Sequence, residues 1–262
     1  MSRLRLEPSG DVLTIVLDRP DARNALDEQA IAELTEALRG PASDSGVRFV
    51  VLRGEGKVFC AGADLDYMRR LAAADDETNQ ADARRLGALF DAIAGCPHPV
   101  LAAVHGAAIG GGIGLVAAAD LVVATEGTKF GFTEVRLGIV PGVISPYAVR
   151  RLGPAVARRL FLTGEIFAAP VARDFGLVDE IVADGALDPA ISRWVERLRV
   201  GGPGAQTAVK RLLDDVLDAP LAEAVQRTPA HIARQRATDE AREGFAAFFE
   251  RRPPSWSPEA KS

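Results

Sequence analysis

The sequence predicts an α/β fold with crossover helices, followed by a helical C-terminal region. Over about the first three quarters of the chain, short apolar and β-branched runs alternate with segments whose apolar residues recur at helical spacing. After about Ile181 the strand-like runs stop. Because strands that alternate with helices favour a parallel sheet, we expect such a sheet in the first part of the chain.

The elements of the first part are justified by local pattern. Asp27 is a candidate cap for a helix in which Ile31, Leu34 and Leu38 recur at helical spacing. The other predicted helices are Tyr67–Ala74, Arg84–Ile93 and Leu115–Ala119. The predicted strands are Val12–Leu17, Phe49–Leu52, Val100–Val104 and Leu121–Ala124.

The later part of the chain is predicted to be helical. The periodic segments are Ala190–Leu198, Ala205–Leu217 and Leu221–Phe249, with breaks expected at Gly201–Gly204, Pro220 and Pro229. We therefore divide the chain into a core of residues 1–195 and a helical region of residues 196–262.

The composition describes an ordinary globular protein in a reducing compartment. Its 262 residues are 48% hydrophobic and 26% charged, and the formal charge of −5 argues against nucleic acid or an anionic membrane as the main partner. Two cysteines, Cys60 and Cys96, cannot form a disulfide framework. His105 and five glycines interrupt the longest apolar segment, Val100–Ala119, and residues 1–10 leave no room for a signal peptide. We expect a cytoplasmic protein.

Two glycine-containing segments are candidates for binding an anion or a developing oxyanion. Phe59–Leu65 follows a predicted strand, and Gly110–Gly114 precedes a predicted helix. Glycine lets the backbone approach a ligand closely, and the N–H groups at a helix start carry partial positive charge. Tight turns and close packing explain such clusters about equally well. Neither segment has the spacing of a dinucleotide-binding loop or a P-loop.

Glu134 is the candidate acid or base. It lies in an apolar stretch, where burial would raise its pKa toward a value useful for proton transfer. The alternative is a surface carboxylate paired with Arg136. Histidine ligation of a metal is not expected from three scattered histidines.

In combination, these segments resemble the crotonase family (the enoyl-CoA hydratase/isomerase superfamily) over nearly the whole chain. Arg19-Pro20 with Asn24-Ala25-Leu26, Ala61–Asp64 and Gly110–Gly112 resemble its motifs. The resemblance implies a spiral of ββα units with a C-terminal helical oligomerisation region, and a homo-trimer or dimer of trimers. It also implies that the N–H groups of Ala63 and Gly111 hold the thioester oxygen of an acyl-CoA, with Glu134 as catalytic glutamate.

The same resemblance indicates where coenzyme A would be held. CoA is part of the substrate here, and no separate cofactor or metal is expected. The residues implied in its binding are Arg23, Ala61, Ala63, Gly111, Phe248 and Arg251. Phe248 and Arg251 resemble residues of the family's C-terminal helix that reach CoA across a subunit boundary.

One departure from the family pattern leaves the reaction open. Typical hydratases carry a second glutamate where this chain has Gly114. Glu134 could serve both proton transfers, another group could assist, or the enzyme could be an enoyl-CoA isomerase. A non-catalytic acyl-CoA-binding or RNA-binding homologue is the non-enzymatic alternative.

The segments Gly112–Val116, Phe132–Arg136 and Gly138–Tyr147 together resemble the bacterial methylglutaconyl-CoA hydratase branch, so the expected reaction is the reversible hydration of 3-methylglutaconyl-CoA in leucine metabolism. The alternative is that the last segment is only a loop variant. Such a substrate carries a distal carboxylate, which needs a cation or a hydrogen-bond donor. The candidate partners are Arg69, Arg70, Lys129, Arg136, Ser145 and Tyr147.

Overall fold

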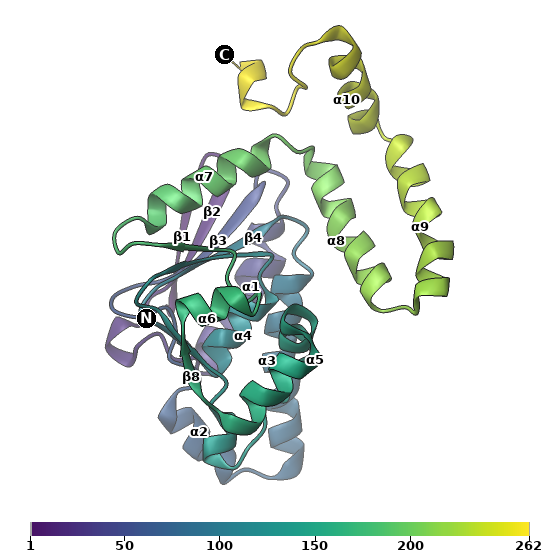
Figure 1. The fold of residues 1–262 in the computed structure, drawn as a ribbon. Coiled ribbons are helices and arrows are strands. Elements are labelled where there is room, and N and C mark those ends of the chain that lie inside the picture. The colour runs from purple at the N-terminus through teal and green to yellow at the C-terminus, as the bar shows by residue number, and fades with distance from the viewer. Residues whose placement is uncertain (1, 262) are drawn as a thin grey trace. The chain divides into compact units, whose positions relative to one another are not determined.

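A six-stranded sheet forms the centre of the first of two compact units (Figure 1). The structure is a computed structural model and describes residues 2–261. The first unit holds the residues up to Cys96 together with Val100–Ile191. The second holds Pro97–Pro99 and the residues from Ser192 onward.

The sheet is parallel except at one edge. Its strand order is β1-β2-β3-β4-β6-β9, in which β1 pairs with β2 antiparallel and every other neighbouring pair is parallel. This topology confirms the predicted α/β fold with crossover connections. The strands are β1 (Leu4–Ser9), β2 (Val12–Leu17), β3 (Phe49–Gly54), β4 (Val100–Val104), β6 (Leu121–Thr125) and β9 (Glu180–Val182).

A second, smaller sheet and six helices complete the first unit. The small sheet has the order β5-β7-β8 and is formed by β5 (Ala107–Ile109), β7 (Lys129–Gly131) and β8 (Ile166–Ala168). The α-helices are α1 (Glu28–Arg39), α2 (Leu65–Ala72), α3 (Asp76–Ala94), α4 (Gly111–Ala118), α5 (Ser145–Thr163) and α6 (Ala169–Asp174). The short 3-10 helices of this unit are η1 (Pro20–Ala22), η2 (Pro41–Ser43) and η3 (Glu134–Leu137).

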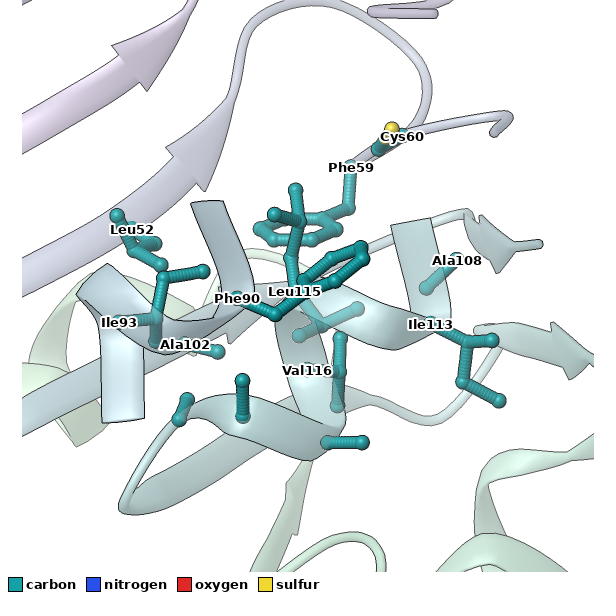
Figure 2. Packing of buried hydrophobic residues seen from close by; sticks show 14 of the residues in the cluster. Leu52, Phe59, Cys60, Phe90, Ile93, Ala102, Ala108, Ile113, Leu115 and Val116 are labelled. Atoms are coloured by element: carbon teal, nitrogen blue, oxygen red, sulfur yellow. The ribbon is translucent and has the colours of Figure 1, made fainter. Parts of the chain in front are cut away.

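Helix α4 lies in the middle of the hydrophobic core. Seven of its eight residues are buried, and its sequence is apolar on every side, as expected of a helix surrounded by protein. Figure 2 shows Leu115 and Val116 of this helix among the side chains of Phe59, Phe90 and Ile93. The start of α4 is therefore held rigidly, which matters for the site described below.

The second unit is helical. α7 (Leu187–Arg199) leads into it from the first unit, and it contains α8 (Pro203–Leu217), α9 (Leu221–Arg236), α10 (Asp239–Glu250) and the 3-10 helix η4 (Pro258–Lys261). Within residues 2–261, none of the helices combines the length and the apolar character needed to cross a membrane.

Several strands were not predicted from the sequence, because they are short or lie at the edge of a sheet. β1 buries only Leu4, so its sequence shows no clear alternation. The three strands of the small sheet have three residues each, too few to show a period of two. Helix α4 also begins at Gly111, four residues before its predicted start at Leu115, because close packing selects glycine in its first turn.

The predicted helix break at Pro229 is wrong. Pro229 lies inside α9, where it cannot donate to the carbonyl of Val225. The hydroxyl of Thr228 donates to that carbonyl instead, at 3.4 Å. The chain breaks later, before α10, where the Thr238 hydroxyl accepts a hydrogen bond from the N–H of Ala241 and caps the next helix.

Candidate active site

The segment around Ala63 is fixed by backbone pairing on one side. Leu26 donates its N–H to the carbonyl of Gly62 at 2.7 Å, and the N–H of Asp64 donates to the carbonyl of Leu26 at 2.9 Å. This is a parallel bridge between Leu26 and Ala63. Because successive residues of an extended chain direct their N–H groups to opposite sides, the N–H of Ala63 points away from Leu26.

On its other side the same segment pairs with β5. The N–H of Cys60 donates to Ala107, and Ile109 donates back to the carbonyl of Cys60, both at 3.1 Å. Gly62 has a φ of +98°, and a methyl group built on it would lie 2.8 Å from the carbonyl oxygen of Ile109. Glycine is therefore required here both for the backbone conformation and for the close approach.

The second candidate donor is the first residue of α4. Gly110 precedes the helix with a φ of +53°, and Gly111 begins it. The first N–H groups of a helix have no partner within the helix, and the helix dipole makes them good donors to negative charge. A methyl group on Gly112 would lie 2.4 Å from the carbonyl of Cys60, so α4 begins in direct contact with the Ala63 segment.

Ala63, Gly111 and Glu134 line one cavity of about 150 Å³. Among the described residues, neither the N–H of Ala63 nor that of Gly111 donates a hydrogen bond. The geometry thus brings together the three residues that sequence analysis proposed for the reaction. The other residues lining the cavity are Leu26, Ile31, Tyr67, Leu86, Ile139, Val140, Pro141, Gly142, Val143 and Ile144.

The Glu134 carboxyl lies against the turn that precedes α4. A methyl group on Gly110 would lie 3.6 Å from Oε1 of Glu134. Its Oε2 is buried, and no donor in residues 2–261 reaches it. Burial raises the pKa of Glu134, because the charged form loses hydration and a hydrogen bond from its own backbone N–H offsets that loss only in part. A half-buried carboxyl that lines a cavity and has one oxygen without a donor is suited to exchange protons with a bound molecule.

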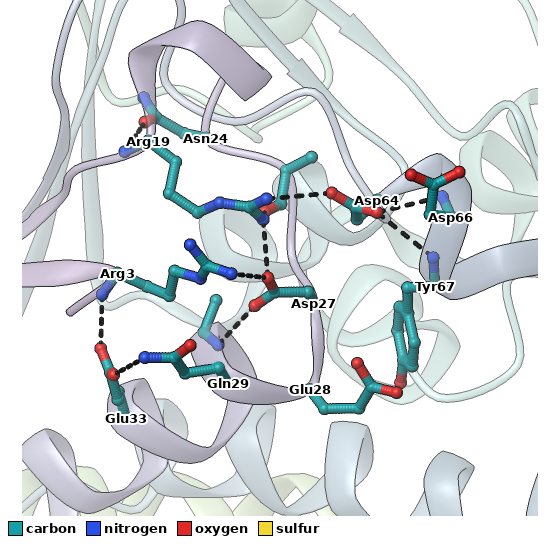
Figure 3. A network of polar contacts seen from close by, with 12 residues as sticks. Arg3, Arg19, Asn24, Asp27, Glu28, Gln29, Glu33, Asp64, Asp66 and Tyr67 are labelled. Atoms are coloured by element: carbon teal, nitrogen blue, oxygen red, sulfur yellow. Dashed lines mark hydrogen bonds and ion pairs between the residues drawn. The ribbon is translucent and has the colours of Figure 1, made fainter. Parts of the chain in front are cut away.

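An ion-pair network ties the Ala63 segment to the start of α1 (Figure 3). The guanidinium of Arg19 contacts Asp27 at 3.0 Å and Asp64 at 3.1 Å, and donates to the carbonyl of Ala25. Asp64 in turn accepts hydrogen bonds from the first backbone N–H groups of α2. Arg19 and Asn24 belong to the N-terminal motif, yet sequence analysis gave neither of them a role at the site.

Two opposing effects act on the Asp64 carboxyl. Partial burial would raise its pKa, but hydrogen bonds from the N–H of Tyr67 and from Arg19 outweigh it and hold the pKa below the ordinary value. Asp64 therefore stays ionised at neutral pH, and so keeps both its contact with Arg19 and its role as the cap of α2.

The place of a second glutamate is filled by hydrophobic packing. A methyl group on Gly114 would lie 2.4 Å from Cγ2 of Ile144 and 2.9 Å from the ring of Phe90. Both neighbours belong to the buried core. Without moving these neighbours, no side chain fits at position 114, so the site has Glu134 as its one carboxylate among the residues that line the cavity.

None of the six candidate partners for a distal carboxylate lines this cavity. Arg69 and Arg70 form ion pairs with Asp66 and Glu28, respectively, and the Ser145 hydroxyl donates to a loop carbonyl. The three others are exposed or packed elsewhere: Lys129, Arg136 and Tyr147.

The residues expected to hold CoA are distributed over both units. Arg23 is exposed, and its carbonyl accepts the N–H of Ala61 at 3.0 Å, so the Ala61 amide is already used. Phe248 lies on α10 with 76% of its surface exposed, and Arg251 ends that helix with a φ of +56°. In residues 2–261, no cluster of three or more His, Cys, Asp or Glu side chains could hold a metal ion.

Comparison with known proteins places the chain in a family. The model of the enoyl-CoA hydratase/isomerase family matches residues 7–259. The (E)-benzylidenesuccinyl-CoA hydratase of Thauera aromatica is 34% identical, over 96% of this chain and 97% of its own. The crotonyl-CoA hydratase of Syntrophomonas wolfei is 32% identical, over 94% and 95%. An enoyl-CoA hydratase from Shewanella pealeana has a crystal structure that matches with a TM-score of 0.93 and 38% identity, covering 97% of this chain and 96% of that one.

The chain therefore belongs to the enoyl-CoA hydratase/isomerase family and has the crotonase fold with C-terminal helices. Its activity is of the enoyl-CoA hydratase type, the addition of water to an unsaturated acyl-CoA.

The packing around Gly114 generates a stability prediction. Gly114→Ala should lower the free energy of unfolding by about 1–3 kcal/mol, because the new methyl group would lie too close to both Ile144 and Phe90. Gly114→Glu should be more damaging still. Urea denaturation measures both. The control is Gly46→Ala, at an exposed glycine with nothing within 4 Å, which should change stability by less than about 1 kcal/mol. Equal stability of Gly114→Ala and the unchanged protein would contradict this assignment.

Proposed function

We propose that this protein reversibly hydrates an α,β-unsaturated acyl-CoA with Glu134 as its single acid and base, and with the N–H groups of Ala63 and Gly111 as the oxyanion hole. The observation that carries the proposal is that these three groups line one cavity, with both amides and one carboxyl oxygen unused by the protein.

In the forward reaction Glu134 takes a proton from a water molecule as the water oxygen bonds to the β-carbon of the substrate. The electron pair of the carbon–carbon double bond moves to the α-carbon and the thioester oxygen, which forms an enolate. The two amides stabilise the negative charge on that oxygen, and the loss of one such donor costs ~3–4 kcal/mol of barrier. Glu134 then returns the proton to the α-carbon, so the net change is the addition of one water.

The CoA portion of the substrate is proposed to meet a different set of residues. A backbone hydrogen bond from Ala61 to Arg23 places Arg23, an exposed residue, next to the Ala61–Ala63 segment. A guanidinium can bind a phosphate with two hydrogen bonds. Phe248 and Arg251 are proposed to contact CoA within a trimer or a dimer of trimers. Sedimentation equilibrium measures that assembly, and a monomer at micromolar concentration would contradict it.

The acyl group is proposed to be uncharged. A distal carboxylate, as in the expected 3-methylglutaconyl-CoA, would enter a cavity whose lining contains no cation and otherwise consists almost entirely of apolar side chains. A carboxylate left there without a partner would pay a large desolvation cost. The lining therefore supports an apolar acyl group in place of a glutaconyl group.

Isomerisation of the double bond is the second candidate, because a single carboxyl group can move a proton between two carbons and Gly114 supplies no second one. Mass spectrometry of the product separates the two reactions, since hydration adds the mass of one water and isomerisation adds none. We expect crotonyl-CoA to gain one water. No conversion of any enoyl-CoA would favour a non-catalytic acyl-CoA-binding or RNA-binding role.

Removal of the Glu134 charge should abolish most turnover without abolishing binding. Glu134→Gln keeps the shape of the side chain but cannot accept the proton, so kcat should fall by about a hundredfold or more, while acyl-CoA affinity changes little. Steady-state kinetics and calorimetric titration measure the two quantities. Glu126→Gln, at an exposed acid, is the matched control and should retain full activity. Turnover by Glu134→Gln close to that of the unchanged protein would refute the assignment.

The pH dependence of kcat/KM should report the buried carboxyl. The base must be ionised, and burial raises the pKa of Glu134, so activity should fall on the acid side at a pH above the ordinary glutamate pKa of about 4.3. The contribution of Glu134 to the free energy of unfolding should rise as pH falls, whereas activity falls. The charged form is disfavoured in the fold, so that cost is relieved as pH falls through the raised pKa. An acid limb centred at or below the ordinary value would contradict the proposed role.

A further inference from the structure

One ionisable side chain in the cavity wall has no part in the proposed reaction. Tyr67 lines the cavity together with Glu134, and the remaining side chains of the lining are apolar. Its side chain is 3% exposed, so the ring belongs to the wall and not to the solvent. A buried tyrosine hydroxyl needs a hydrogen-bond partner, and this one has a partner outside the cavity lining.

Tyr67 is held at both ends. Its backbone N–H donates to Oδ1 of Asp64, in the cap of α2 that Figure 3 shows, and its hydroxyl donates to Oδ1 of Asp82 at 2.5 Å. Asp82 lies on α3, is 5% exposed, and is paired with Arg85 at 3.2 Å. Burial and the hydrogen bond to Asp82 both raise the pKa of Tyr67, so the phenol remains protonated and keeps its proton directed at Asp82.

The ring is therefore a fixed wall and not a proton donor to the substrate. Ile31 of α1 and Leu86 of α3 also line the cavity, so three helices contribute this apolar surface. The volume of about 150 Å³ is small: an apolar cavity of that size holds benzene, which has six carbons.

We propose that Tyr67, locked in place by Asp82, is a specificity-determining residue that restricts the acyl group to a short, apolar chain of about four to six carbons. This inference rests on the proposed hydratase function. Removing the ring would join its volume to the cavity, and removing its anchor would let the ring move.

The test compares hydration of crotonyl-CoA (four carbons) and trans-2-decenoyl-CoA (ten carbons). The protein with Tyr67 should have a kcat/KM at least tenfold higher for the four-carbon substrate. Tyr67→Ala should reduce that ratio by about tenfold or more, because room for even one further methylene in a tight apolar pocket is worth a factor of about ten. If Tyr67→Ala does not fold, Tyr67→Leu serves the same purpose with a smaller change in volume.

Two further variants separate the ring from its anchor. Tyr67→Phe keeps the ring and loses the hydrogen bond to Asp82, so its discrimination should lie between that of the unchanged protein and that of Tyr67→Ala. Asp82→Ala frees the hydroxyl and should weaken discrimination by an intermediate amount. Leu71→Ala is the matched control, since this side chain also packs from α2 against the core but does not line the cavity. Its chain-length ratio should be unchanged.

The outcomes distinguish the two proposals. If the unchanged protein hydrates neither substrate nor any shorter or longer enoyl-CoA, the proposed function fails. If it hydrates crotonyl-CoA but accepts decenoyl-CoA equally well, or if Tyr67→Ala leaves the ratio within threefold of the original while crotonyl-CoA is still hydrated, the role of Tyr67 is refuted and the hydratase function stands.

Discussion

The backbone pairing of Leu26 with Ala63 is the interaction on which the site depends. Two hydrogen bonds hold the segment against Leu26, and two more hold it against β5, so it has little freedom to rotate. Electrostatic stabilisation of a transition state requires donors that are already oriented before the charge appears. The Arg19 network adds to this rigidity, because it joins the cap of α2 to the start of α1 through one guanidinium.

Much of the fold and the site could be predicted from the sequence, for identifiable reasons. The central strands are continuous apolar runs, and Asp27 caps α1 as expected. No such signal marks the three-residue strands or the edge strand β1, because they form by pairing with distant segments. The helix through Pro229 was also missed, because the hydroxyl of Thr228 donates to the carbonyl that Pro229 leaves without a donor. The glycines of the site were visible, but the contacts that require them were not, since Cys60 and Ile109 approach from other elements.

The residues that line the acyl side of the cavity could not be predicted from the sequence. Cationic side chains could be counted in the sequence, but no pattern told which of them would face the ligand. The acyl side of the cavity combines single residues of α1, α2 and α3 with the loop before α5, and none of the cations considered lines the cavity. Tyr67 in the wall and its partner Asp82 behind it are separated by fifteen positions in the sequence, so their contact is evident only when α2 and α3 pack together.

The oxyanion donors are main-chain groups, and this has a consequence for how the gene can vary. Any amino acid except proline brings an N–H to position 63 or 111. The need for a hydrogen-bond donor therefore places little constraint on the side chains at these two positions. It acts instead on the neighbours that shape the chain: Gly62 with its positive φ, and Gly112 against Cys60. In a saturation-mutagenesis library, substitutions at Gly62 and Gly112 should therefore reduce activity more often than substitutions at the donor positions 63 and 111.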